Sequence, residues 1–400
     1  MRVLLFLVCV AQALLPVLTE QAGVPVPQEP ESYERGRVVE RLATMIDPSI
    51  TYAYYLPANY DAAKRWPIVY VFDPGKRGPL AAELFREAAE ANGWIVVSSN
   101  DTSSAADWRP NSKAINAMWP DAQRRFSVDT KRIYAAGMSG GAIMAWSLAK
   151  TSKAVAGVIG CSGRLADDHD TDGISFDWVG TAGLGDFNHN ETRLIESKLA
   201  AAHATYRVEI VEGGHRWPPS STIREAVEWM ELQAMRRGTR TRDEALIARL
   251  LDADLAAAAK LDELNAMRRY DAIVRTFDGL ADVASAKKKA DELRGSAAVK
   301  RALREERNGD EFERNAKQRM ARAVQEFVHD DAELGTTLAL ELDLSHLRKQ
   351  ASGSNYEAAV AQRVLALTRF QLRSLAEDLY AHGRTSRAEV VRAVAQQAGQ

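Results

Sequence analysis

The chain has 400 residues, of which 46% are hydrophobic and 26% charged, and its formal net charge is −2. This composition is typical of a globular protein and differs from that of a disordered chain or a membrane-embedded helix bundle. The chain is long enough for two domains, each with its own core. Because no large excess of basic residues is present to neutralise phosphates, the composition argues against a nucleic-acid-binding function.

The N-terminus has the pattern of a secretory signal. Arg2 precedes the apolar run 3–10, and residues 11–13 (Ala-Gln-Ala) have the small side chains expected at a cleavage site. We therefore predict a signal peptide over residues 1–22 and a secreted or periplasmic protein. An uncleaved membrane anchor is the alternative.

The composition changes sharply along the chain. All eight Trp lie at or before Trp229, and all 13 Pro lie at or before Pro219. We interpret this change as a domain boundary, with a first domain over residues 30–237 and a second over residues 240–400.

The first domain alternates strand-like and helix-like segments. Ile68–Phe72 is a continuous apolar run, typical of a strand that is covered on both faces. Such alternation predicts an α/β fold with a mostly parallel sheet flanked by helices. Residues 50–56 come earlier and are predicted to form an antiparallel edge strand. The other predicted strands span residues 94–97, 132–136, 155–159, 178–181 and 207–211, and the predicted helices 80–91, 112–126, 141–150, 192–202 and 222–235.

The second domain is predicted to be all-helical, because its apolar residues recur at helical spacing, as at Leu372, Leu375 and Leu379. Parts of it resemble tetratricopeptide helices, although no fixed repeat period is present. We expect five to seven helices, with breaks near Gly279, Gly295, Asn308-Gly309, Gly335 and Ser352-Gly353-Ser354.

The segment Gly137-Met138-Ser139-Gly140-Gly141 matches the pattern G-x-S-x-G. It lies between a predicted strand and a predicted helix, which is the context of a nucleophile elbow. The glycines permit a strained turn that projects the Ser139 hydroxyl, and the helix N-terminus can stabilise a developing negative charge. We therefore predict that Ser139 is a nucleophile; a simple glycine turn is the alternative.

A serine nucleophile needs a base, and the base needs a carboxylate. His215 follows the last predicted strand of the first domain in a glycine-rich loop, and we predict that it is the base. Asp186 follows the preceding strand and is the predicted carboxylate. Asp177 is a rival, but it precedes that strand and should lie at the opposite end of the sheet. The order Ser, Asp, His is that of α/β-hydrolases.

An oxyanion formed at Ser139 requires two hydrogen-bond donors. One should be the amide of Gly140, directly after the nucleophile. The other should come from the loop after residues 68–72. Because Pro74 has no N–H, Gly75 or Lys76 is predicted to donate.

Residues 52–229 resemble the α/β-hydrolase superfamily, and in particular secreted esterases of the polyhydroxyalkanoate-depolymerase-like and feruloyl-esterase-like branch. The resemblance is carried by residues 125–134, which lead into the elbow, and by Gly213–Pro218 around the histidine. It implies Ser139 as nucleophile, His215 as base and Asp186 as acid. These relatives usually have a His-Gly pair in the oxyanion loop, where this chain has Asp73-Pro74-Gly75.

Three tryptophans are placed near predicted strand ends or in the loops that follow them. We predict that Trp108, Trp119 and Trp217 line the substrate pocket, with core packing as the alternative for each. Asp168–Gly173 resembles the start of a calcium loop, but its twelfth position is Val179, which cannot bind a cation. We predict no metal site and no cofactor.

These observations predict a serine hydrolase that cleaves a small-molecule or polymeric carboxylic ester through an acyl-enzyme intermediate. A serine peptidase of the same fold is one alternative, because the three predicted residues do not distinguish esters from amides. Another is that the helical domain binds a protein partner while the hydrolase domain is tethered or inactive. A helical domain that only packs on the hydrolase or covers its site is the third possibility.

Overall fold

The structure is a computed structural model that describes residues 32–104, 108–165, 171–330 and 343–398. The predicted signal peptide over residues 1–22 lies outside the described residues. So do the first three residues, 168–170, of the calcium-like segment Asp168–Gly173. Within the described ranges, none of the helices has the length and apolarity needed to cross a membrane.

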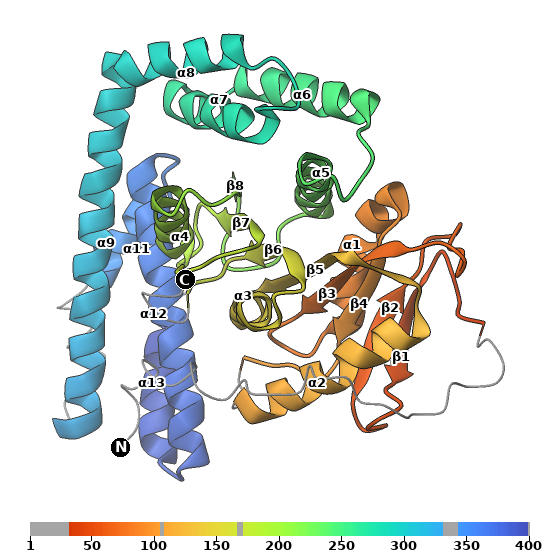
Figure 1. Ribbon diagram of the computed structural model, residues 1–400. Helices are drawn as coiled ribbons and strands as arrows, with labels where there is room; N and C mark the ends of the chain where they lie inside the picture. Colours follow the sequence, from red (N-terminus) through yellow and green to blue (C-terminus); the bar gives the residue numbers. More distant parts are fainter. Residues whose placement is uncertain (1–31, 105–107, 166–170, 331–342, 399–400) are drawn as a thin grey trace.

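The residues described between 38 and 211 form an eight-stranded sheet (Figure 1). The order of the strands is β1-β2-β4-β3-β5-β6-β7-β8. β2 runs antiparallel to its two neighbours, and the pairs from β4 to β8 are parallel. The strands are β1 (Val38–Ala43), β2 (Thr51–Tyr55), β3 (Trp66–Phe72), β4 (Ile95–Ser99), β5 (Val128–Met138), β6 (Val155–Cys161), β7 (Asp177–Gly183) and β8 (Tyr206–Val211).

Helices cover both faces of this sheet and bury two apolar cores. α2, α3 and α4 pack on one face, and α1 and α5 on the other. Every residue of β3 is buried, as expected for a strand between two helical layers. The predicted α/β fold class, with a helical region after it, is therefore confirmed. These helices are α1 (Gly78–Asn92), α2 (Trp108–Arg125), α3 (Gly140–Ser152), α4 (His189–Ala201) and α5 (Ser220–Arg236).

One strand was not predicted. β2 is antiparallel, as expected, but it is not the edge strand, because β1 pairs with its outer side. β1 includes the exposed charged residues Glu40 and Arg41, so it lacks the apolar run that marks the other strands. Charged side chains of this kind are common on edge strands, where they discourage pairing with another chain.

The second region is helical wherever it is described. The predicted breaks at Gly279, Gly295 and residues 352–354 all separate helices, and Gly335 lies outside the described residues. These helices range from 8 to 34 residues, unlike the equal helix pairs of a tetratricopeptide array. They are α6 (Glu244–Ala258), α7 (Glu263–Phe277), α8 (Ala284–Gly295), α9 (Ala297–Asp330), α11 (Leu344–Ala351), α12 (Tyr356–Ala381) and α13 (Thr385–Gln397).

The predicted break at Asn308-Gly309 was wrong, because α9 continues through it. A Cβ at Gly309 would lie 2.7 Å from a ring carbon of Tyr356 and 2.9 Å from a methyl carbon of Val360. Gly309 therefore permits the close crossing of α9 and α12 and does not end a helix.

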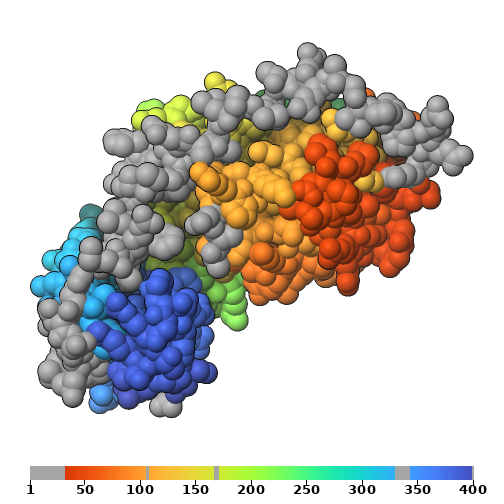
Figure 2. All heavy atoms as spheres, turned by 90° about the horizontal axis from the view of Figure 1, so that it is seen from below, coloured from red at the N-terminus to blue at the C-terminus, as the bar shows by residue number. Residues whose placement is uncertain are grey.

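The described part of the helical region has three apolar clusters: a small one around Val299 and two larger ones, one of which includes residues of α5. α9, α11, α12 and α13 enclose one core, while α6, α7 and α8 pack around Leu232 and Met235 of α5. The indole of Trp229, also on α5, donates a hydrogen bond to Thr276 Oγ1 of α7 at 3.1 Å. Figure 1 shows α6–α8 beside α5, and Figure 2 shows the C-terminal helices and the first strands at opposite ends of the molecule.

A buried ionic network also joins the two regions. Arg207 of β8 is 5% exposed and donates to both carboxylate oxygens of Asp254 on α6, at 2.8 and 3.0 Å. Arg269 of α7 pairs with the same Asp254 and with Glu209 of β8, the latter at 2.7 Å. Each charge has partners of opposite sign, which offsets the cost of removing these groups from water.

We expect Asp254→Ala to lower the free energy of unfolding by about 3 kcal/mol or more, because it removes the carboxylate that accepts two hydrogen bonds from the buried Arg207 and one from Arg269. Urea denaturation followed by circular dichroism measures this change. Glu305→Ala is the matched control, since it breaks a pair with Arg301 in which both side chains are more than 60% exposed. The control should change stability by about 0.5 kcal/mol or less. Equal effects of the two substitutions would contradict a stabilising role of the buried network.

Candidate active site

The turn between β5 and α3 holds Ser139 in a strained conformation. Ser139 has φ 55° and ψ −120°, which non-glycine residues rarely adopt and which costs roughly 1–3 kcal/mol. The neighbouring backbone leaves no room for side chains. A Cβ at Gly137 would lie 2.1 Å from the carbonyl oxygen of Gly141, and one at Gly141 would lie 2.0 Å from that of Phe72. The glycines of the motif are therefore required by close backbone packing.

Ser139, His215 and Asp186 form a chain of hydrogen bonds. Nε2 of His215 lies 2.9 Å from Oγ of Ser139, and its Nδ1 lies 2.9 Å from Oδ1 of Asp186. The three residues follow β5, β8 and β7, so the parallel sheet brings them to the same edge. The rival Asp177 is at the beginning of β7 and forms an ion pair with Arg237 at 2.8 Å.

The Asp186 carboxylate is fully buried and remains an acceptor. Burial by itself would raise its pKa, but hydrogen bonding and charge interaction with His215 and the amide of Asn188 outweigh this effect and hold the pKa below its usual value. The Asn188 amide donates to Oδ1 at 2.8 Å, and the Asn188 side chain donates to the carbonyl of Ser162. An ionised Asp186 can orient the His215 ring and stabilise its protonated form.

The predicted oxyanion donors are only partly available. Gly140 is the first residue of α3, so its amide has no acceptor within the helix. The second donor was predicted to be Gly75 or Lys76. The Gly75 amide already donates to Oδ1 of Asp73 at 2.8 Å, so it is not free to bind an oxyanion. Lys76, at φ 62°, is the other, and its amide has no hydrogen-bond partner within the described part of the chain.

Asp73 organises this loop from a completely buried position. Its carboxylate accepts hydrogen bonds from the Gly75 amide, from the Trp217 indole at 2.8 Å and from the Arg77 guanidinium at 2.9 and 3.0 Å. Burial opposes the charge, but these donors hold the pKa of Asp73 below its usual value. Asp73 thus ties this loop to the segment after β8.

Two of the three predicted pocket tryptophans lie in the cores. Trp119 is 7% exposed and stacks on Tyr70, with ring centroids 4.4 Å apart. Trp217 is 9% exposed and packs edge-on against Phe85 while it binds Asp73. The prediction that they line a pocket was therefore wrong for both. Trp108 is half-buried at the start of α2 and stays a prediction.

The loop that carries Asp186 is held by the helical region. Arg363 of α12 and Glu313 of α9 are both fully buried and lie 2.6 Å apart. Arg363 also donates to the carbonyl of Leu184 at 3.2 Å, and Glu313 accepts from the Asn190 side chain at 3.1 Å. Both ends of the loop are thus bound to a buried ion pair of α9 and α12.

Lys317 of α9 adds a third contact to this loop. Its Nζ lies 3.3 Å from the carbonyl oxygen of Phe187 and 2.8 Å from Glu313. Figure 1 shows α9 and α12 running side by side next to α4, which begins at the end of the loop. The sequence did not indicate this arrangement, because contacts between residues more than 100 positions apart leave no local pattern.

Two aromatic rings accompany His215. The ring of Phe187 stacks on the imidazole with centroids 4.0 Å apart, and Phe370 of α12 lies 5.1 Å from Phe187 and 6.3 Å from His215. Phe187 is 7% exposed, whereas Phe370 is 52% exposed. The sequence predicted no role for either ring.

Ser104 is another residue of the candidate site that the sequence did not indicate. It lies beside Gly140, and its hydroxyl oxygen would be 2.2 Å from a Cβ on that glycine.

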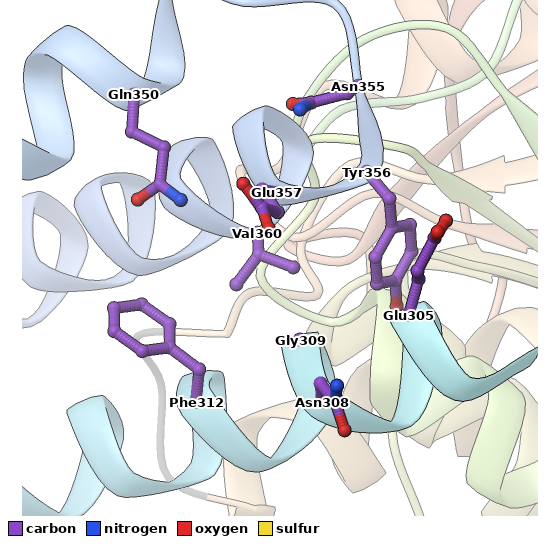
Figure 3. Close-up of a pocket in the computed structure, with 9 residues that line it drawn as sticks. All are labelled: Glu305, Asn308, Gly309, Phe312, Gln350, Asn355, Tyr356, Glu357 and Val360. Carbon is purple, nitrogen blue, oxygen red and sulfur yellow. The ribbon is translucent and has the colours of Figure 1, made fainter. Parts of the chain in front are cut away.

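A separate hollow lies between α9 and the start of α12, outside the candidate active site (Figure 3). It has a volume of about 400 Å³, and Figure 3 shows the rings of Phe312 and Tyr356 at its sides. None of its lining residues belongs to the hydrogen-bonded chain at Ser139. Among the described residues, no group of three or more His, Cys, Asp or Glu side chains is placed to hold a metal ion.

Comparisons with known proteins return similar folds only. No protein-family model matches the chain, and no curated protein matches it. A ferulic acid esterase shares 16% identity over 48% of this chain and 97% of its own, with a TM-score of 0.41. A fluorophosphonate-binding serine hydrolase of Staphylococcus aureus shares 14% identity over 49% of this chain and 99% of its own, with a TM-score of 0.42. Dipeptidyl peptidase 4 of Porphyromonas gingivalis shares 15% identity over 48% of this chain and 34% of its own, with a TM-score of 0.37. At these values neither activity nor substrate is transferred to this chain.

The buried His189, at the start of α4, makes stability depend on pH. Burial, together with the charges of Arg363 and Arg193, lowers its pKa to about 3, against about 6.5 in an unfolded chain. Between these two pKa values the unfolded state binds a proton that the folded state does not. The contribution of His189 to the free energy of unfolding is therefore complete above pH 6.5 and is lost as the pH falls toward 3.

We expect the wild-type protein to lose about 2 kcal/mol more unfolding free energy than His189→Gln between pH 7 and pH 5. Urea denaturation at the two pH values measures the difference. His382→Gln, which removes a histidine with a 68% exposed side chain, should keep the wild-type dependence. An unchanged pH dependence in His189→Gln would show that His189 does not cause it.

Proposed function

We propose that this protein is a serine hydrolase that cleaves carboxylic esters. The observation that carries the proposal is the continuous hydrogen-bond chain from Ser139 through His215 to Asp186, with the serine in a strained turn at a helix N-terminus. A serine hydroxyl in contact with an oriented imidazole is activated as a nucleophile. The buried Asp186 selects the tautomer in which Nδ1 carries a proton and Nε2 accepts one.

The proposed reaction has two acyl-transfer steps. Oγ of Ser139 attacks the ester carbonyl while Nε2 of His215 takes its proton, and the oxyanion accepts hydrogen bonds from the Gly140 and Lys76 amides. Collapse of the intermediate transfers the proton from His215 to the departing alcohol and leaves an acyl-serine. Water then attacks this ester with His215 as base, and the carboxylic acid and free Ser139 are released.

Two features support an active enzyme over an inactive tethered domain. The Ser139 backbone remains strained, and such strain persists where a function requires it. The helical region binds the Asp186 loop with three polar contacts, so in this proposal it belongs to the enzyme and is not an independent binding module. We retain the predicted secreted or periplasmic location as part of the proposal, since it depends on residues 1–22 alone.

We expect a fluorophosphonate probe to label the purified protein and hydrolysis of p-nitrophenyl butyrate to exceed that of peptide p-nitroanilides. Ser139→Ala should abolish labelling and lower kcat by roughly 10³-fold or more, because it removes the nucleophile. Ser197→Ala, which removes an exposed hydroxyl of α4, is the matched control and should retain both activities. Faster hydrolysis of the anilides would favour a peptidase, and a folded wild type that is not labelled would exclude the proposed mechanism.

A further inference from the structure

Phe370 is a large apolar side chain that is exposed beside His215. It is on α12, more than 150 positions after the histidine, and 52% of its surface is exposed. Most other aromatic side chains of the described chain are buried in the cores. An apolar ring that stays in water next to a candidate general acid is available to contact a substrate.

The position of Phe370 is defined by the same contacts that hold the loop around Asp186, residues 184–190, which we call the acid loop. Arg363, two turns earlier on α12, is fully buried and bonded to Glu313 and to the Leu184 carbonyl. Phe370 itself packs against Phe187, which stacks on the imidazole. The three rings form a continuous series from His215 outward, which we call the aromatic shelf: His215, Phe187 and Phe370.

The chemistry of the reaction decides which part of the substrate meets this shelf. His215 must deliver a proton from Nε2 to the leaving oxygen, so the alcohol part of an ester departs on the side of the imidazole. The acyl part stays bound to Ser139 after the alcohol has left. A group next to His215 therefore contacts the alcohol before it contacts the acid.

We propose that Phe370 determines leaving-group specificity and selects esters whose alcohol part is aromatic or extended and apolar. The inference rests on the proposed function, because it assigns the alcohol side by the proton transfer from His215. Phe187 provides the inner, buried part of the contact and Phe370 the outer part. The helical region thus contributes a substrate-binding residue to a site whose reacting groups all come from the first domain.

The experiment compares two series of esters by pH-stat titration. Methyl, hexyl and benzyl butyrate vary only the alcohol, and methyl acetate, butyrate and hexanoate vary only the acid. In Phe370→Ala, the ratio of kcat/KM for benzyl butyrate to that for methyl butyrate should fall roughly tenfold. The hexanoate-to-acetate ratio should stay within about twofold. Phe370→Leu, which keeps an apolar side chain, should lose selectivity for benzyl more than for hexyl butyrate.

Phe312→Ala is the matched control, because it removes another exposed phenylalanine, on α9, that lines the separate hollow of Figure 3. It should leave both ratios unchanged. An unchanged benzyl-to-methyl ratio in Phe370→Ala, or a change confined to the acyl series, would overturn the assignment. Fluorophosphonate labelling of Ser139 separates the two failures: labelling with unchanged alcohol selectivity refutes only the role of Phe370, and no labelling of the wild type refutes the hydrolase itself.

Discussion

The contact that the candidate site depends on is the packing of the end of β5 against the end of β3 and the start of α3. The carbonyl oxygen of Phe72 lies where a side chain on Gly141 would be. The carbonyl oxygen of Gly141 lies where a side chain on Gly137 would be. This packing requires a turn that Ser139 completes at positive φ. It aims the Ser139 hydroxyl toward the edge of the sheet and starts α3 directly behind it. The strands on either side then determine which loops can reach the hydroxyl.

The acid loop shows a second constraint, in which buried charges connect regions that are distant in sequence. A fully buried Arg363 would be costly by itself, and Glu313 and the Leu184 carbonyl compensate it. The same Glu313 accepts from Asn190 and pairs with Lys317. Removal of α9 and α12 would therefore take away three polar contacts of the loop around Asp186, those of Leu184, Phe187 and Asn190. The two regions of the chain are linked here and again at Arg207, where β8 meets α6.

Asp73 shows how one buried carboxylate can hold two loops together. Its carboxylate binds the Gly75 amide, the Arg77 side chain and the Trp217 indole, so it links the loops after β3 and β8. Because Trp217 is two residues from His215, this hydrogen bond connects the candidate base to the loop that holds the Lys76 amide. The contact also explains why Trp217 is buried and does not line a pocket.

The sequence by itself determined the α/β class, the segments of most strands and helices, and the three residues of the hydrogen-bonded chain. These features leave local patterns: apolar runs mark strands such as β3, glycines mark the elbow at Ser139, and the order of strands and loops selects Asp186 and His215. Only the tertiary structure decided the rest. β1 is a strand because it pairs with β2. α9 continues through Gly309 because it crosses α12 closely there, and the Gly75 amide is occupied because it donates to Asp73. Phe370 reaches His215 only because α12 packs beside the acid loop. Such contacts depend on residues far apart in the chain, and no spacing within the sequence encodes which of them will meet.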